Sequence, residues 1–173
     1  DYKNKFDNSL CKITKSKYAI SVFSGTAALH LALRVLGVKE GHEVVVPSLT
    51  FIASVNVIKY LNSNPIFMDV DENHNLDIFK TIDFLKKNTF TINKKTFNKK
   101  TRKRISVVII THMWGNALDF SKLASLCKKK KNIFIVEDAA EALGTYYCKG
   151  VYKNKHVGTI ADIGCLSFNG NKI

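Results

Sequence analysis

The sequence predicts an α/β fold in which a mostly parallel mixed sheet is covered by helices on both faces. Short apolar segments alternate along the chain with longer segments that have helical spacing of apolar residues. The apolar segments are nearly continuous hydrophobic runs, as in strands that are buried on both faces. The predicted strands cover residues 43–47, 65–70, 105–111, 132–138 and 162–168. The 173 residues fit one domain, 1–173.

The helices of this fold are predicted from apolar spacing and from stop signals. After Ser24, the segment 25–36 opens with Gly25 behind a presumed strand and is followed by Gly37, which is a common helix stop. Its apolar face is expected to hold Ala28, Leu31, Ala32, Val35 and Leu36. Further helices are predicted at 51–61, 76–87 and 118–130, and a hairpin or loop at 146–158.

Composition limits the class of protein. Hydrophobic residues make up 46% and charged residues 24%, as in ordinary globular proteins. No apolar run reaches the roughly 18 residues of a membrane-spanning helix. The four cysteines include no C-x-x-C pair, which predicts reduced thiols in a cytoplasmic protein, with Cys127 and Cys165 in apolar surroundings. The missing initiator Met and the ending just past a strand indicate a fragment of a longer protein.

The net charge of +13 raises the question of a nucleic-acid partner. Much of the charge lies in 93–104, NKKTFNKKTRKR, which is predicted to be an exposed loop, and in 128–131, where cations favour a helix end. The chain lacks the mixed aromatic and basic pattern of single-strand binders. A basic nucleic-acid-binding domain is therefore a minor alternative.

Candidate functional residues follow the predicted strands, because ligands of open parallel sheets bind beyond the carboxyl ends of the strands. These segments are 24–26, 47–51, 112–115, 138–141 and 167–172. The free N–H groups where Gly25, Thr26 and Ala27 open a helix suit a phosphate, although an ordinary N-cap explains the same residues. Asp138 at a buried strand end needs a partner, such as a protonated pyridine nitrogen, or it caps a helix.

Ser167 and Lys172 lie on either side of the turn that follows the last predicted strand. The serine hydroxyl could hold a phosphate, and the lysine amine could form a Schiff base. Together with Asp138 and the helix start, these residues describe a site for pyridoxal 5′-phosphate.

Other signals point to no separate site. The segment 69–77, DVDENHNLD, is similar to a calcium loop but has His74 where glycine is needed and is followed by Lys80 where glutamate is needed. No metal is therefore expected. His112 is equally compatible with a structural role and with a substrate contact, and Trp114 is expected to pack.

Four segments resemble the DegT/StrS-type sugar aminotransferases, which have the aspartate aminotransferase fold. They are SGTAALHLAL (24–33), VVVPSLTFIASVNVI (44–58), EDAAEALG (137–144) and GTIADIGCLSFNGNK (158–172). The resemblance covers essentially the whole chain. It implies the three-layer large domain of a fold-type I pyridoxal phosphate enzyme, without its N-terminal segment and its small C-terminal domain. SFNGNK and the insert before 105 look most like the branch that aminates UDP-linked 4-keto-6-deoxy-N-acetylhexosamines for bacterial surface glycans such as lipopolysaccharide.

The resemblance also implies roles for individual residues. Lys172 would be the Schiff-base lysine, and Asp138 would pair with the pyridine nitrogen. Phe51 would cover one face of the cofactor ring and Ala140 the other, while Glu141 would lie near the 3-hydroxyl. The phosphate would be held by Gly25, Thr26, Ala27 and Ser167.

The activity implied by the resemblance is a ping-pong transamination. Glutamate would give its amino group to the cofactor, which would pass it to the 4-keto sugar, with Lys172 as acid and base. The full-length protein would be a homodimer, and the fragment alone would be inactive. A non-catalytic regulatory member of the same fold is the main alternative, and intact Lys172, Asp138 and Ser167 argue against it.

Overall fold

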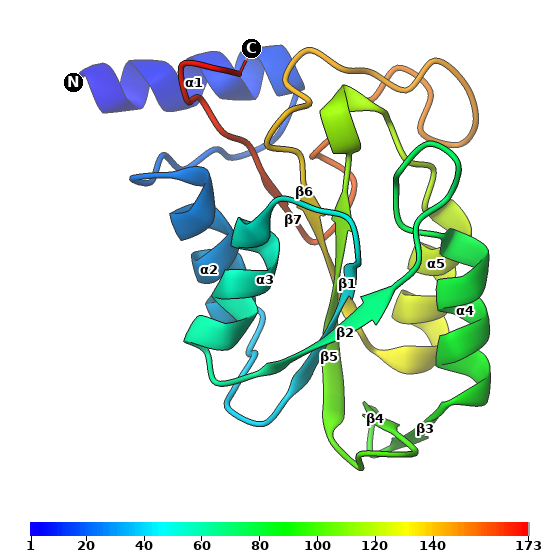
Figure 1. Ribbon diagram of the computed structural model, residues 1–173. Helices are drawn as coiled ribbons and strands as arrows, with labels where there is room; N and C mark the ends of the chain where they lie inside the picture. Colours follow the sequence, from blue (N-terminus) through cyan, green and yellow to red (C-terminus); the bar gives the residue numbers. More distant parts are fainter. Residues whose placement is uncertain (173) are drawn as a thin grey trace.

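The computed structural model describes residues 1–172, without the side chain of Lys130, and shows three layers (Figure 1). Helices α2 (Gly25–Val35) and α3 (Ile52–Tyr60) cover one face of a central sheet, and α4 (Ile78–Lys87) and α5 (Ser121–Leu126) cover the other. Helix α1 (Tyr2–Thr14) lies beyond the sheet, at the end where both chain termini are found. The predicted α/β architecture is confirmed.

Five strands form the parallel part of the sheet in the order β2-β1-β5-β6-β7. Their bounds are β1 Glu43–Pro47, β2 Asn64–Met68, β5 Arg104–Thr111, β6 Phe134–Asp138 and β7 Ile163–Cys165. Each agrees with a predicted strand, and β7 is the shortest at 3 residues. Because the five strands are parallel, their carboxyl ends meet at one edge of the sheet.

The central strands β1, β5 and β6 are buried on both faces, as their continuous apolar sequences predicted, whereas the edge strand β2 is only partly buried. Val44 and Val46 of β1 pack into the core beneath α2 and α3, whereas Val45 between them packs into the core beneath α4 and α5. In β5, Ile109 and Ile110 divide between the two cores in the same way. Successive side chains of a strand point to opposite faces, so each residue of these runs is needed by one core or the other.

Helix α2 buries only part of the expected face: Ala28, Ala32 and Leu36 pack into the core, but Leu31 and Val35 do not. Leu29, Ala32 and Leu33 are buried, whereas Leu31 and Val35 are 48% and 69% exposed. A helix that is apolar on most of its surface does not reveal by spacing alone which stripe meets the sheet. The predicted stop is confirmed, since Gly37 follows the helix with a φ of +78°.

The basic segment 93–104 is not a loop. Strand β3 (Thr89–Ile92) and strand β4 (Lys95–Asn98) form a hairpin, and β4 continues antiparallel onto the start of β5. The two-residue turn has positive φ at Asn93 and Lys94, as type I′ turns require. Asn98 Nδ2 donates to the buried Glu43 Oε2 at 2.9 Å, which joins the hairpin to β1. The hairpin projects from the end of the sheet opposite the strand carboxyl ends (Figure 1).

Two predicted elements differ from the structure, and a third agrees with it. No strand precedes Gly25, because residues 15–24 pair with no neighbouring strand in the described chain. The helix predicted at 118–130 is shorter: α5 begins at Ser121 and passes into a π-helical turn, η2 (Cys127–Lys131). Leu118 is outside the helix because its N–H and carbonyl bond to His112 and Tyr147. The bridge between Tyr146 and His156 agrees with the predicted hairpin or loop.

Two further observations bear on the class of protein. No helix among residues 1–172 is long and apolar enough to cross a membrane. Cys127 and Cys165 are buried, as predicted, and burial raises the pKa of each thiol to about 12. These two thiols therefore stay protonated at neutral pH.

Candidate active site

The carboxyl ends of β5, β6 and β7 bring the main candidate residues to one edge of the sheet. Thr111 ends β5, Asp138 ends β6, and Ser167 follows β7 by two residues. The backbone of Asp138 is fixed on both sides, since His112 N donates to Asp138 O at 3.0 Å and Ala139 N donates to Cys165 O at 2.9 Å. This edge is the place where an open parallel sheet binds ligands.

The start of α2 forms a small cradle with Ser167. Ser24 is the N-cap, and its Oγ accepts from Ala27 N at 3.1 Å, so the ordinary capping interaction is present. A Cβ at Gly25 would lie 3.1 Å from Ser167 Cβ and 3.2 Å from Ser167 Oγ. A larger residue at position 25 would crowd the serine, so glycine favours the close approach of the hydroxyl to the first turn, where the N–H groups of Gly25 and Thr26 have no partner within the helix. The cradle is suited to an anion.

Asp138 is buried, with 4% of its surface exposed. Its Oδ2 accepts from Ser54 Oγ at 2.5 Å, and its Oδ1 accepts from Ala140 N at 3.2 Å. Burial raises the pKa of Asp138, against the opposing effects of these hydrogen bonds and of the positive charge of Lys172. A buried carboxylate of this kind is well placed to pair with a cationic group.

Lys172 and Phe51 face each other beside this carboxylate. Lys172 Nζ lies 5.9 Å from the centroid of the Phe51 ring, and the ring is 70% exposed. The turn after β7 is closed by a hydrogen bond from Lys172 N to Asn169 O at 2.8 Å. Asn169 Nδ2 also donates to Asn171 Oδ1 at 2.9 Å, so Asn169 shapes the turn that carries the lysine. Lys172 therefore contacts the Phe51 ring, and its positive charge acts on Asp138.

Glu141 and Trp114 form a second contact at the rim. Trp114 N donates to Glu141 Oε2 at 3.1 Å, in the short 3-10 turn η1 (Met113–Gly115). Trp114 has a φ of +51° and is 63% exposed, and its ring packs on His74 at 5.1 Å. Glu141 is exposed, so it can also reach a ligand at the rim.

His112 has a structural role, which decides between the two possibilities that the sequence left open. Its Nδ1 accepts from Leu118 N at 3.1 Å, so the proton of the neutral ring is on Nε2, which lies 3.0 Å from Glu137 Oε2. Glu137 is fully buried and also accepts from three backbone N–H groups of the loop before β7. They belong to Gly158, Ile160 and Ala161.

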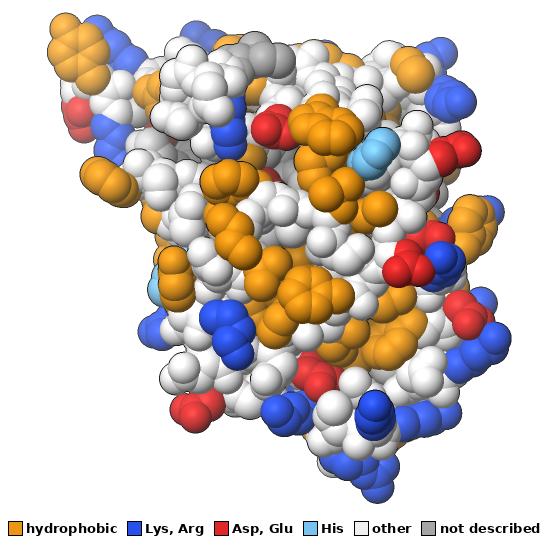
Figure 2. Space-filling view, in the orientation of Figure 1, with side chains coloured by type: hydrophobic (Ala, Val, Ile, Leu, Met, Phe, Trp, Pro, Cys, Tyr) orange, Lys and Arg blue, Asp and Glu red, His pale blue; other side chains and the backbone are white. Residues whose placement is uncertain are grey.

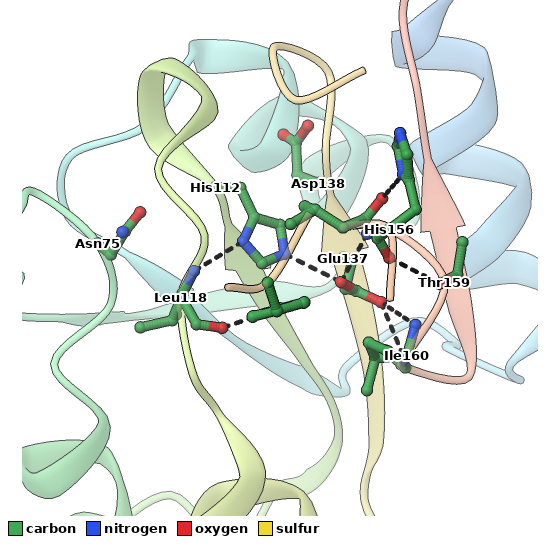
Figure 3. Close-up of polar contacts among 12 residues, drawn as sticks. Asn75, His112, Leu118, Glu137, Asp138, His156, Thr159 and Ile160 are labelled. Carbon is green, nitrogen blue, oxygen red and sulfur yellow. Dashed lines mark hydrogen bonds and ion pairs between the residues drawn. The ribbon is translucent and has the colours of Figure 1, made fainter. Parts of the chain in front are cut away.

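Neighbouring carboxylates on β6 therefore have different surroundings (Figure 3). Glu137 and Asp138 point in different directions, as successive strand residues do, and only Glu137 joins the His112 network. Burial alone would raise the pKa of Glu137, but the hydrogen bond from His112 and those from the backbone donors hold its pKa below the ordinary value. Glu137 fixes the loop before β7 and is already satisfied.

Sequence reasoning missed a group of hydroxyls behind Asp138. Ser54 is fully buried, and Thr50 Oγ1 lies 3.3 Å from Ser54 Oγ and 3.2 Å from Thr111 Oγ1. The only sequence signal is the four-residue spacing of Thr50 and Ser54 across the start of a helix, which is too common to indicate a site.

A groove of about 1100 Å³ lies beside the cradle, between α1, the segment 15–24, α2 and the chain around β7. Its lining includes Gly25 and Ser167, but Asp138, Lys172 and Phe51 lie outside it. The groove therefore meets the site only at the anion cradle. Among residues 1–172, no three His, Cys, Asp or Glu side chains gather as a metal site.

An open parallel sheet that carries an anion cradle, a buried aspartate and a lysine at its carboxyl edge matches the large domain of aminotransferases. A DegT DnrJ EryC1 StrS aminotransferase from Brucella abortus superposes with a TM-score of 0.85 at 25% identity, over 98% of this chain and 42% of that one. The PLP form of the putative sugar aminotransferase Spr1654 from Streptococcus pneumoniae gives 0.81 at 27% identity, over 99% and 42%.

The chain belongs to the DegT/DnrJ/EryC1/StrS aminotransferase family, whose profile matches residues 1–173. It is 38% identical over 172 residues to a GDP-perosamine synthase of Escherichia coli O157:H7, covering 99% of this chain and 42% of the relative. It is 37% identical over 174 residues to the putative pyridoxal phosphate-dependent aminotransferase EpsN of Bacillus subtilis, covering 98% and 40%. The chain thus spans about two fifths of the length of these relatives.

Proposed function

We propose that the complete gene product is a pyridoxal phosphate-dependent aminotransferase. It transfers an amino group from glutamate to the 4-keto carbon of a nucleotide-linked deoxysugar, for a bacterial surface glycan. One observation carries the proposal: the anion cradle at Gly25 and Ser167, the buried Asp138 and Lys172 all lie at one edge of the sheet. Family membership supports it.

The residues present fit the cofactor. The absence of a Cβ at Gly25 brings Ser167 Oγ close to the first-turn N–H groups of α2, and these donors together suit the phosphate. Asp138, buried and already holding two hydrogen bonds, would pair with the ring nitrogen. The exposed Phe51 would cover one ring face and Ala140 the other.

When bound, pyridoxal phosphate supplies an electron sink for the carbon that loses a proton. Lys172 Nζ would attach the cofactor and then, as a free amine, take up and return the proton at the donor carbon. Asp138 would keep the ring nitrogen protonated. Glu141, exposed at the rim and held by Trp114 N, would lie near the ring hydroxyl.

The acceptor sugar has two candidate classes. The sequence resemblance favours a UDP-linked 4-keto-6-deoxy-N-acetylhexosamine, whereas GDP-perosamine synthases are among the relatives by name. We therefore propose a nucleotide-linked 4-keto-6-deoxyhexose as the acceptor. Glutamate is the proposed donor for either sugar, and 2-oxoglutarate release in the presence of the GDP-linked or the UDP-linked keto sugar distinguishes them.

The proposed assembly is a homodimer. Hydrophobic side chains gather on the face formed by α3 and β2 (Figure 2), where Ile52, Tyr60 and Phe67 are each more than half exposed. An apolar surface of this kind suits a second copy of the protein. Size-exclusion chromatography with light scattering tests the dimer, and Phe67→Glu is expected to weaken it.

The alternatives fit the structure less well. A regulatory protein has no need of Lys172, Asp138 and Ser167 in one place. A nucleic-acid role would rest on the basic hairpin β3–β4, which lies at the end of the sheet opposite the site (Figure 1). Binding to random DNA that weakens steeply with salt would support that role.

The decisive experiment traps the cofactor on the complete gene product. The protein is incubated with pyridoxal phosphate, reduced with borohydride, digested and analysed by mass spectrometry. We expect one pyridoxyl adduct, on Lys172, which is lost in Lys172→Ala and kept in the surface control Lys153→Ala. The absence of an adduct, or adducts scattered over surface lysines, would refute the proposed function.

A further inference from the structure

Three hydroxyl groups form a chain that ends on the Asp138 carboxylate. Ser54 Oγ donates to Asp138 Oδ2 at 2.5 Å, so Ser54 must accept the proton that Thr50 Oγ1 donates at 3.3 Å. Thr50 has then used its own proton, so at 3.2 Å it accepts from Thr111 Oγ1. Each hydroxyl carries one proton, and all three therefore point toward the carboxylate.

This direction favours the ionised form of Asp138. A carboxylate accepts hydrogen bonds, and a chain of donors pointing at it is polarised and strengthened in a site of low dielectric. Ser54 is fully buried, and Thr111 and Asp138 are 8% and 4% exposed, so little water competes. Hydrogen bonds to a charged group are worth more than neutral ones.

The chain also fixes where the carboxylate points. The backbone of Asp138 is held by β5 and β7, but within the described residues its side chain receives only two hydrogen bonds, from Ser54 and from Ala140 N. Ser54 lies in the first turn of α3, which follows directly after Phe51. The same turn thus holds the carboxylate and starts at the aromatic ring proposed to cover the cofactor.

Resting on the proposed function, we propose that Ser54, supported by Thr50 and Thr111, is a positioning residue that aims the Asp138 carboxylate at the cofactor ring nitrogen. Ser54 does not touch the reacting atoms, and it acts through Asp138. The same hydroxyl lowers the pKa of Asp138, which burial raises. The charged group that acts on Asp138 is Lys172, which also lowers that pKa, whereas the neutral His112 ring faces Glu137.

The test measures pyridoxal phosphate affinity of the complete gene product by absorbance and fluorescence titration. Ser54→Ala removes the hydroxyl, and Ser54→Thr keeps it. Ser106→Ala is the matched control, because the Ser106 hydroxyl is also buried but has no hydrogen-bond partner among the described residues. Melting of each apoprotein is measured in parallel, so that loss of folding is recognised.

We expect Ser54→Ala to bind pyridoxal phosphate about ten- to a hundredfold more weakly, since it loses one hydrogen bond to a charged group. Ser54→Thr should recover most of the affinity, and Ser106→Ala should match the wild type. The gap between Ser54→Ala and wild type should widen as pH falls, because removing the donor lets Asp138 protonate at higher pH. Thr50→Val, a smaller change, should weaken binding about threefold.

Two results would overturn the inference. One is a Ser54→Ala protein that binds like Ser106→Ala. The other is a loss that Ser54→Thr does not recover, with Thr50→Val unchanged, which would mark Ser54 as a packing residue only. If Ser54→Ala does not fold, the cofactor affinity of Thr50→Val is the test, and an affinity equal to that of the wild type overturns the inference. If only this inference is wrong, the wild-type protein still gives the pyridoxyl adduct on Lys172. If the proposed function is wrong, no variant, and not the wild type, gives that adduct.

Discussion

Replacing Glu137 by glutamine is the sharpest test of the buried network behind the site. The carboxylate has two acceptor oxygens, and each receives two donors. Oε1 accepts from Ile160 N and Ala161 N, both at 2.7 Å. Oε2 accepts from Gly158 N at 2.8 Å and faces His112 Nε2 at 3.0 Å.

A glutamine amide cannot satisfy this arrangement. Whichever way it turns, its NH₂ group faces two donors. His112 cannot change tautomer to help, because its Nδ1 accepts from Leu118 N. The loss of two hydrogen bonds to a charged group costs about 3–6 kcal/mol. Part of this cost is offset, because the neutral amide no longer requires a charge to be buried. We expect the loop 158–161 to lose about 3 kcal/mol of local stability.

The assay is amide hydrogen exchange of the complete gene product, read on peptides that cover 158–161. A loss of about 3 kcal/mol corresponds to roughly hundredfold faster opening. Glu40→Gln, at an exposed position, is the control and should change exchange by less than about threefold.

The pH dependence of hydrogen exchange in the loop 158–161 provides a second test. The folded-state pKa of Glu137 is lowered from its ordinary value of 4.5. Its stabilising contribution is therefore complete above about pH 4.5 and is lost as pH falls through the folded-state pKa. Wild-type protection of the loop should fall in acid through this window, and Glu137→Gln should lack that part of the fall. Unchanged exchange in Glu137→Gln would refute the assignment of Glu137 as the residue that holds this loop.

Three further predictions concern the site and the hairpin. Phe51→Ala should weaken pyridoxal phosphate binding about fivefold in a fluorescence titration, from about 1 kcal/mol of ring stacking, and leave melting unchanged, because the ring is 70% exposed. Equal affinity would place the ring elsewhere. Gly25→Ala should weaken the binding of inorganic phosphate and of the cofactor about tenfold, because the alanine methyl would crowd Ser167. The substitution should not destabilise α2, because alanine favours a helix over glycine by up to about 1 kcal/mol. A protein that melts lower but binds normally would contradict this. Asn98→Ala should lower the free energy of unfolding, measured in urea, by about 1–3 kcal/mol, because buried Glu43 loses its hydrogen-bond donor. Cofactor affinity should be unaltered. Weaker cofactor binding would contradict this and would show that the two ends of the sheet are coupled.

The layers of the fold could be predicted from the sequence because a strand that is buried on both faces requires an uninterrupted run of apolar residues. Val44, Val45 and Val46 must all be apolar when alternate residues serve different cores. The hairpin at 89–98 was missed because the lysines of the segment 93–104 dominate its composition, while residues that build the hairpin, such as buried Thr96 and Asn98, alternate with exposed ones. The exposed Leu31 and Val35 were misplaced because apolar spacing is ambiguous on a helix that is apolar nearly all round.

What the sequence by itself determined are the five parallel strands, the approximate extents of α2, α3 and α4, and the candidate residues that follow the strands, since these depend on local patterns. Only the tertiary structure decided which polar groups are already satisfied and which remain available. His112 and Glu137 satisfy each other, whereas Asp138, one residue further along β6, faces Ser54 and Lys172. Hydrogen-bond partners that are 25 and 84 residues apart in the chain leave no periodic trace, because they exist only after the strands and helices have packed together.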